Sequence, residues 1–160
     1  AHRFASWAEN IVVKIPILNE FGEPCLGVIN GLIEEQIQVN MTAVMSFGQL
    51  ALGAKSGATY ISIFAGRVSD EGHDSTLLIR QSADWLKEWG YTSKIIVGSI
   101  REAINIQDAA LAGAHVITVP PQFLQKWVDH QNTRATVRTF NEDAKTSFAK
   151  LKEIRVQAGR

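Results

Sequence analysis

The sequence predicts an α/β fold in which parallel strands alternate with helices. Short apolar runs rich in β-branched residues recur along the chain and are bounded by turn-forming residues. Between them lie stretches with the apolar period of a helix, several of which end at a glycine. Strict alternation of strand and helix favours a parallel sheet with right-handed crossovers. Two architectures fit this pattern, a doubly wound open sheet and part of a (β/α)8 barrel.

The individual elements follow from the same signals in chain order. Strands are predicted at 10–16, 38–44, 59–65, 94–99 and 115–120. Helices are predicted at 26–36, 46–55, 75–89 and 101–111, with a further helix opening at Pro121. Asp74 or Ser75 is the expected N-cap of the third helix. In both architectures the functional groups lie at the carboxyl ends of the strands.

We expect one domain over 1–160, closed by a tail helix from about 135 to 154. An apolar stripe runs along this helix, formed by Val137, Phe140, Ala144, Phe148 and Leu151. A stripe of this kind predicts packing on the barrel or on a neighbouring subunit. We also expect a homo-oligomer, whose order the sequence does not give.

Composition and charge exclude several classes of protein. The chain has 46% hydrophobic and 20% charged residues, close to globular averages, and its 16 basic residues balance 16 acidic ones. A net charge of zero argues against a nucleic-acid partner and against a polybasic membrane anchor. No apolar stretch reaches the roughly 18 residues of a membrane span. With a single cysteine, Cys25, no intrachain disulfide forms, and we expect a cytoplasmic protein.

A lysine inside the first apolar run is the first candidate for chemistry. Lys14 lies two residues before the proline that closes this run. A lysine on a buried strand is costly unless its ammonium reaches solvent at the strand end or the amine is used. The functional interpretation is a desolvated amine that attacks a carbonyl. On this motif alone, the packed and solvated lysine is the more common case.

Further polar side chains lie at the carboxyl ends of the other strands. They are Asn40, Thr42, Ser62, Arg67, Ser99 and Arg101. An arginine beside a helix N-terminus is typical of a phosphate site, and an amine opposite it suggests Schiff-base chemistry on a phosphorylated sugar. Each residue has a purely structural alternative. Asn40, Thr42 or Ser99 could cap the following helix, and Arg67 could pair with Asp70 on the surface. No metal-ligand spacing is present.

Five motifs in order give the chain a specific resemblance. They are IVVKIP at 11–16, VNMTAVMS at 39–46, ISIFAGRV at 61–68, VGSIR at 97–101 and GAHVITVP at 113–120. Together they resemble the transaldolase and fructose-6-phosphate aldolase family of class I aldolases, whose fold is a TIM (β/α)8 barrel. The match runs from residue 10 to about residue 148.

This resemblance implies a role for each candidate residue. Lys14 would be the Schiff-base lysine, and Asn40 and Thr42 would hold substrate hydroxyls and the catalytic water. Ser62, which matches a serine typical of transaldolases, and Phe64 would also bind substrate. Arg67, Ser99 and Arg101 would bind the substrate phosphate, and the reaction would need no metal or organic cofactor. The aldolase branch carries a tyrosine where this chain has Phe64, which therefore favours a transaldolase.

The resemblance also implies that part of the barrel lies outside these residues. The five predicted strands correspond to strands four to eight of the family, whereas essential carboxylates come from strands one to three. We expect those three βα units on another segment or another chain. The predicted function is transfer of a dihydroxyacetone unit between sugar phosphates, as in pentose phosphate metabolism. The alternatives are fructose-6-phosphate aldolase-type cleavage and a non-catalytic sugar-phosphate-binding fragment.

Overall fold

The computed structural model describes residues 1–159. The chain divides into two compact units, Ala1–Pro120 and Pro121–Arg160. The first unit holds a parallel sheet with its covering helices, and the described residues of the second form two helices joined by residues 129–130. The single domain expected over 1–160 stays a prediction.

The first unit contains a five-stranded parallel sheet. Its strands are β1 (Val13–Pro16), β2 (Val39–Val44), β3 (Tyr60–Phe64), β4 (Lys94–Gly98) and β5 (Val116–Ile117). Each strand pairs with the next in sequence, in the order β1-β2-β3-β4-β5. A doubly wound sheet reverses its strand order, whereas a barrel keeps consecutive strands adjacent. The order therefore selects the second architecture, the C-terminal βα units of a (β/α)8 barrel.

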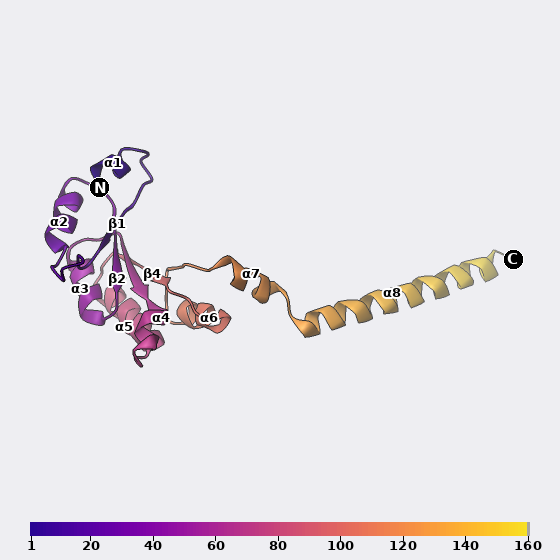
Figure 1. Ribbon diagram of the computed structural model, residues 1–160. Coiled ribbons are helices and arrows are strands. Elements are labelled where there is room, and N and C mark those ends of the chain that lie inside the picture. Colours follow the sequence, from indigo (N-terminus) through magenta and orange to yellow (C-terminus); the bar gives the residue numbers. More distant parts are fainter. Residues whose placement is uncertain (160) are drawn as a thin grey trace. The chain divides into compact units, whose positions relative to one another are not determined.

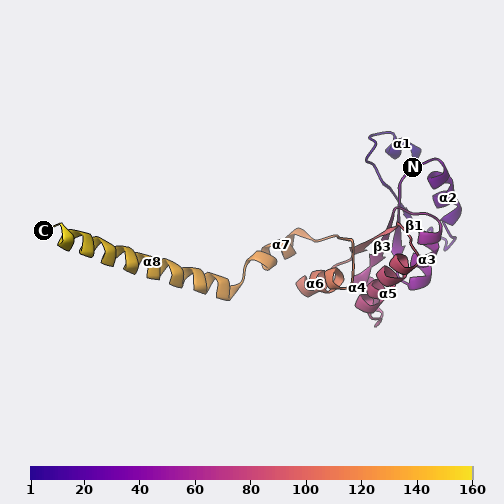
Figure 2. The same cartoon turned by 180° about the vertical axis from the view of Figure 1, so that it is seen from behind.

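Helices follow the strands and cover one face of the sheet (Figures 1 and 2). They are α2 (Leu26–Glu34), α3 (Phe47–Lys55), α5 (Ser75–Glu88) and α6 (Ala103–Leu111), with the short helix α4 (Ala65–Asp70) directly after β3. A further short helix, α1 (His2–Ala5), precedes β1. Asp74 caps α5 as predicted, because its carboxylate accepts a hydrogen bond from the Leu77 amide at 2.9 Å. The helices α1 and α4 were not predicted, since four- and six-residue helices carry too little periodicity to recognise.

The hydrophobic core lies between the sheet and these helices. One row of strand side chains is fully buried there, comprising Val39, Met41, Ile61, Ile63, Ile95 and Val97. Because side chains alternate between the two faces of a strand, the intervening residues point to the opposite face. That opposite row, here called the helix-free face, includes Lys14, Asn40, Thr42, Ser62 and Phe64, and the same register adds Tyr60, Lys94 and Ile96.

The fifth strand is shorter than predicted. It was expected at 115–120, and only Val116–Ile117 are extended strand. His115 and Thr118 still donate backbone hydrogen bonds to the carbonyls of Ile95 and Val97 at either end. The His115 ring adds one more bond, because Nδ1 accepts from the Ile95 amide at 3.1 Å. His115 therefore has a structural role, because its backbone and its ring both form hydrogen bonds with Ile95 at the edge of the sheet.

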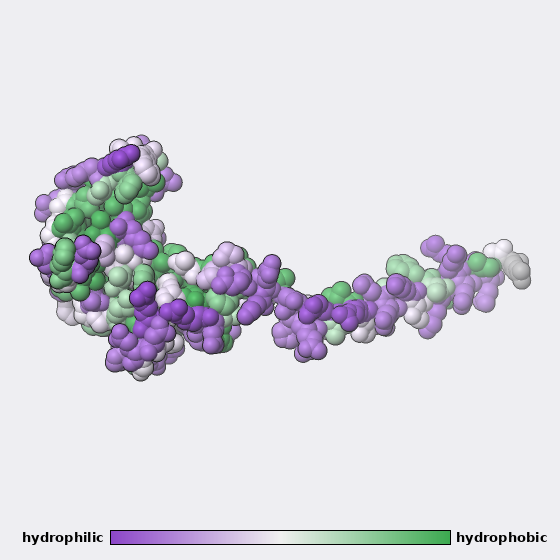
Figure 3. All heavy atoms as spheres, viewed as in Figure 1, coloured by the Kyte–Doolittle hydropathy of each residue, from purple (hydrophilic) through white to green (hydrophobic). Residues whose placement is uncertain are grey.

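The second unit consists of α7 (Pro121–Val128) and α8 (Gln131–Ala158). The tail helix α8 was predicted at 135–154 and is four residues longer at each end. It begins early because His130 caps it, accepting from the Asn132 amide, and it continues until Gly159. None of its residues is buried within the described chain, and hydrophobic residues lie at intervals along its surface (Figure 3).

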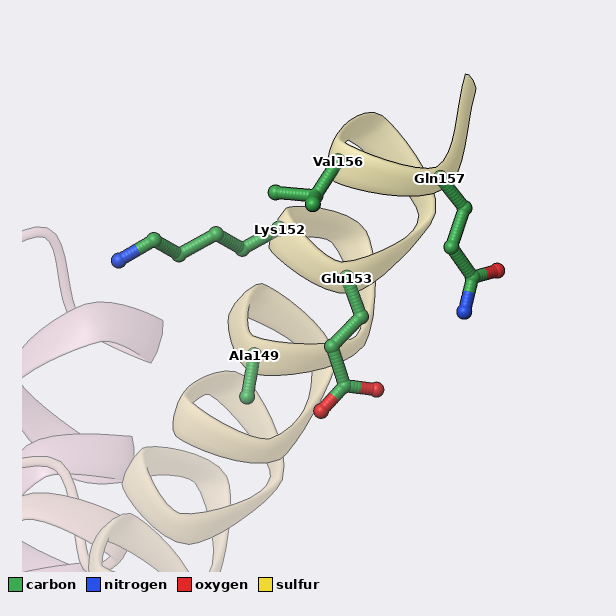
Figure 4. Close-up of a pocket in the computed structure, with 5 residues that line it drawn as sticks. All are labelled: Ala149, Lys152, Glu153, Val156 and Gln157. Atoms are coloured by element: carbon green, nitrogen blue, oxygen red, sulfur yellow. The ribbon is translucent and has the colours of Figure 1, made fainter. Parts of the chain in front are cut away.

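A hollow of about 400 Å³ lies on the last turns of α8. It is lined by Ala149, Lys152, Glu153, Val156 and Gln157, and Figure 4 shows that all five side chains project from this one helix. The hollow is therefore a gap between neighbouring side chains of a helix surface and holds none of the predicted site residues.

Within residues 1–159 no helix combines the length and the hydropathy that a membrane span requires.

Candidate active site

Lys14 stands on β1 and belongs to the helix-free face. Its backbone is paired with that of Asn40, and its Nζ lies 5.9 Å from the centroid of the Phe64 ring on β3. The lysine therefore reaches across β2 toward the carboxyl end of β3. The expectation of a buried amine was wrong for this chain, because Lys14 is exposed. The helices cover only the other face of the sheet.

Asn40 and Ser62 form the polar centre of the helix-free face. The Ser62 hydroxyl donates to the Asn40 Oδ1 at 2.7 Å, and Ser62 is only 2% exposed. This bond fixes the orientation of the Asn40 amide and leaves its two N–H donors for another partner. The capping alternative for Asn40 and Thr42 was wrong. Ser46 caps α3 instead, accepting from the Gln49 amide.

Thr42 occupies a bulge that sequence reasoning missed. Met41 is in register with Ile61, and Val44 with Ile63, so β2 holds one residue more than β3 between these pairs. Ala43 absorbs the extra residue with a left-handed backbone, at a φ of 61°. Positive φ at a residue other than glycine is uncommon and often marks a functional constraint. Simple alternation along the strand contains no signal for this bulge.

The Thr42 hydroxyl is left without a partner in this bulge. Thr42 is 8% exposed, and its Oγ1 is buried with no hydrogen-bond partner among the residues that the structure describes. A buried hydroxyl without a hydrogen-bond partner is costly. Because Thr42 lies on the helix-free face, its hydroxyl is placed to form a hydrogen bond with a ligand or a water molecule.

The carboxyl ends of β3 and β4 hold the predicted phosphate-binding residues. Arg67 is exposed on α4, and Ser99 follows β4 with a left-handed backbone at a φ of 60°. The Arg101 Nη2 donates to the Asp70 carboxylate at 2.7 Å. Asp70 therefore pairs with Arg101 and not with Arg67, the partner considered from the sequence.

Two further details define this end of the sheet. Ser99 does not cap the helix that follows, because α6 begins at Ala103 with a capping box between Glu102 and Asn105. A cavity of about 290 Å³ lies beside this corner, with Gly66, Asp70 and Arg101 among its lining residues. The Asp70–Arg101 pairing joins two different βα units, so no local sequence signal could have found it.

The first unit thus brings an amine, an amide and an aromatic ring onto one face of five consecutive βα units, with two arginines after β3 and β4. Within residues 1–159, no group of three or more histidine, cysteine, aspartate or glutamate side chains is arranged to hold a metal ion. Fold and site together define a protein of the (β/α)8-barrel class with a lysine at the carboxyl side of a barrel strand.

Comparison with known proteins identifies the family within that class. The model of the transaldolase/fructose-6-phosphate aldolase family matches residues 1–159, and the chain belongs to this family. The family is a TIM barrel, in agreement with the strand order.

Curated relatives agree with the family. The chain is 39% identical over 139 residues to a probable transaldolase of Herpetosiphon aurantiacus, covering 87% of this chain and 61% of the relative. It is 38% identical over 146 residues to a probable transaldolase of Dehalococcoides mccartyi, covering 91% and 66%. A probable transaldolase of Lactiplantibacillus plantarum is 40% identical over 146 residues, covering 91% and 65%. The chain therefore spans a little under two thirds of the length of these relatives.

A solved structure supports the fold alone. A mutant flavocytochrome b2 with pyruvate bound superposes with a TM-score of 0.51 at 14% identity. The match covers 64% of this chain and 28% of the flavocytochrome chain.

Proposed function

We propose that this chain carries the Schiff-base lysine and the substrate-binding side of a transaldolase-type active site. The neutral Lys14 amine attacks the C2 carbonyl of a ketose phosphate, and water leaves as the imine forms. A base then removes the proton of the C4 hydroxyl, and the C3–C4 bond breaks. Its electron pair enters the imine to give an enamine of dihydroxyacetone, while an aldose phosphate departs. The enamine then attacks the aldehyde of an acceptor aldose phosphate, and water releases the new ketose phosphate and the free lysine.

The observation that carries this proposal is the alignment of Lys14 with hydrogen-bonding groups on one face. Lys14 and Asn40 are register partners, and Ser62 holds the Asn40 amide by its 2.7 Å hydrogen bond. The amide N–H groups are then oriented to hold a substrate hydroxyl beside the imine. The unpaired Thr42 Oγ1 provides a second polar group on the same face. The names of the relatives, probable transaldolases, support the same reaction class.

Three further βα units complete this site in our proposal. The proposed base is a carboxylate of the segment that corresponds to strands one to three of the barrel, on the same or a separate chain. This segment would also cover the helix-free face and desolvate Lys14. We propose in addition that the assembled protein is a homo-oligomer.

Trapping with borohydride tests the proposal on the chain as it stands. Imine formation needs only the amine and the carbonyl, and borohydride reduces the imine to a stable amine. With fructose 6-phosphate and borohydride, we expect the mass of the protein to increase by one reduced adduct. Lys14→Arg should abolish this increase. Lys94→Arg is the matched control, because Lys94 is an exposed lysine of β4 on the same sheet. Equal adduct formation by the two variants would contradict the proposal.

Two other functions use the same residues. In fructose-6-phosphate aldolase-type cleavage, water protonates the enamine and no acceptor is needed. The ring of Phe64, which has no hydroxyl to donate a proton beside Lys14, favours transfer over this cleavage. A non-catalytic sugar-phosphate-binding fragment is favoured by the exposure of Lys14. Release of glyceraldehyde 3-phosphate with and without an acceptor aldose phosphate separates the three functions.

A further inference from the structure

The Arg101 side chain is half-exposed and contacts two residues of the neighbouring βα unit, Asp70 and Gly66. Its Nη2 is bonded to Asp70 on α4 at 2.7 Å. On its other side it passes directly over Gly66, where a Cβ atom would lie 2.8 Å from the Arg101 Nε and 2.9 Å from its Cγ. Arginine loses considerable rotamer entropy when it is fixed by a ligand. A side chain already fixed by its own protein loses less on binding.

The backbone under Arg101 is fixed as well. The Gly66 amide donates to the Ser99 carbonyl at 3.0 Å, which joins the ends of β3 and β4. A Cβ on residue 66 would lie only 2.1 Å from that same carbonyl oxygen. This close approach is the reason that position 66 requires glycine. The backbone conformation is not the reason, because the φ of Gly66 is not positive. Ser99 itself has a left-handed backbone, so the chain turns sharply just before Arg101.

The Asp70 bond uses only one nitrogen of the guanidinium group. Arginine has five N–H donors in a planar fork, and a phosphate takes two of them side by side. With Nη2 bonded to Asp70, donors on the other nitrogens stay available for an anion. A cavity of about 290 Å³ lies beside Arg101, and its lining also includes Asp70, Glu102 and Asn105.

We infer that Asp70 is a positioning residue, which orders Arg101 for binding of the substrate phosphate. This inference rests on the proposed function and adds to it the residue that fixes the phosphate-binding group. An alternative effect of the same carboxylate is electrostatic, because its negative charge repels a phosphate. The two effects have opposite signs. Ordering strengthens binding of the phosphorylated sugar, whereas repulsion weakens it.

Substitutions that separate geometry from charge test the inference. Asp70→Ala removes both the hydrogen-bond acceptor and the charge, whereas Asp70→Asn keeps an acceptor oxygen and removes only the charge. Calorimetric titration of the chain with fructose 6-phosphate and with fructose measures both sugars by the same method. We expect Asp70→Ala to weaken binding of fructose 6-phosphate about three- to fivefold, the upper part of the range of an exposed ion pair, and to leave binding of fructose unchanged. Asp70→Asn should stay within about twofold of the original chain.

A matched control and the contradicting results complete the design. Asp129→Ala removes a comparable exposed ion pair, that of Asp129 with Arg134 at 3.0 Å, and should change the binding of neither sugar. Tighter binding of fructose 6-phosphate by both Asp70 variants would overturn the inference in favour of repulsion. An equal loss for fructose, or no loss in Asp70→Ala, would also overturn it. Failure to trap an adduct on Lys14 would contradict the proposed function. Binding in the titration does not require an imine, so the titration tests the role of Asp70 separately.

Discussion

The hydrogen bond between Ser62 and Asn40 allows a sharp prediction, because a second buried serine with a comparable hydrogen bond, Ser93, lies just before β4 at the other end of the sheet. In Ser62→Ala the hydroxyl that donates to the Asn40 Oδ1 at 2.7 Å is lost at a site that is 2% exposed. The Asn40 oxygen then has no partner from Ser62. Loss of a buried neutral hydrogen bond of this kind costs about 1–2 kcal/mol in unfolding free energy.

The control is Ser93→Ala. The Ser93 hydroxyl donates to the Ala58 carbonyl at 2.6 Å and is 6% exposed, but it precedes β4, at the amino end of the sheet. Denaturant titration should therefore show a similar loss of about 1–2 kcal/mol in both variants.

The two variants should differ in chemistry. Ser62→Ala frees the Asn40 amide to rotate away from the substrate, so borohydride trapping with fructose 6-phosphate should slow about tenfold, equivalent to about 1.4 kcal/mol. Ser93→Ala should trap at the original rate. Equal trapping rates in the two variants would refute the argument that Ser62 orients Asn40 for substrate.

Two further predictions concern residues around the site. Gly66→Ala should destabilise the first unit by about 1–3 kcal/mol in denaturant titration, because its Cβ would lie 2.1 Å from the Ser99 carbonyl oxygen. Gly31→Ala on α2 is the control, because no atom lies within 4 Å of the added Cβ, and it should raise the unfolding free energy by about 0.5–1 kcal/mol. A loss of less than about 0.5 kcal/mol in Gly66→Ala would contradict the close approach. Thr42→Val removes a buried hydroxyl that has no hydrogen-bond partner among the described residues, and it should raise the unfolding free energy by about 1 kcal/mol. The same variant should bind fructose 6-phosphate more weakly in calorimetric titration. A loss of stability in Thr42→Val would show that the hydroxyl has a partner in the free protein.

Much of the fold follows from local sequence signals. The strands β2, β3 and β4 and the helices α2, α3, α5 and α6 begin and end within two residues of their predicted limits. Apolar runs and capping residues mark these limits directly. The two edge strands were predicted too long, β1 by three residues at its start and β5 at both ends, since an edge strand has a pairing partner on one side only. The tail helix was predicted too short, because residues 131–134 are all polar and the apolar stripe recognised in the sequence stops at Leu151, although neither end contains a helix breaker.

The candidate site could be predicted only in part. Parallel strands bring their carboxyl ends to one edge, which is why Lys14, Asn40 and Ser62 could be grouped from the sequence. The exposure of Lys14 could not be predicted, because burial depends on what covers the helix-free face. The left-handed Ala43 and the Asp70–Arg101 pair also escaped prediction. Both arise from the fit between separate βα units and not from any residue's own preference.

The most direct test of the central claim is the position of the trapped adduct. After incubation of the chain with fructose 6-phosphate and borohydride, peptide mapping by mass spectrometry identifies the modified lysine. We predict one reduced adduct, on the peptide that contains Lys14, with none on the peptide of Lys94. An adduct spread over several lysines, or none with any ketose phosphate, would contradict the assignment of Lys14 as the Schiff-base residue.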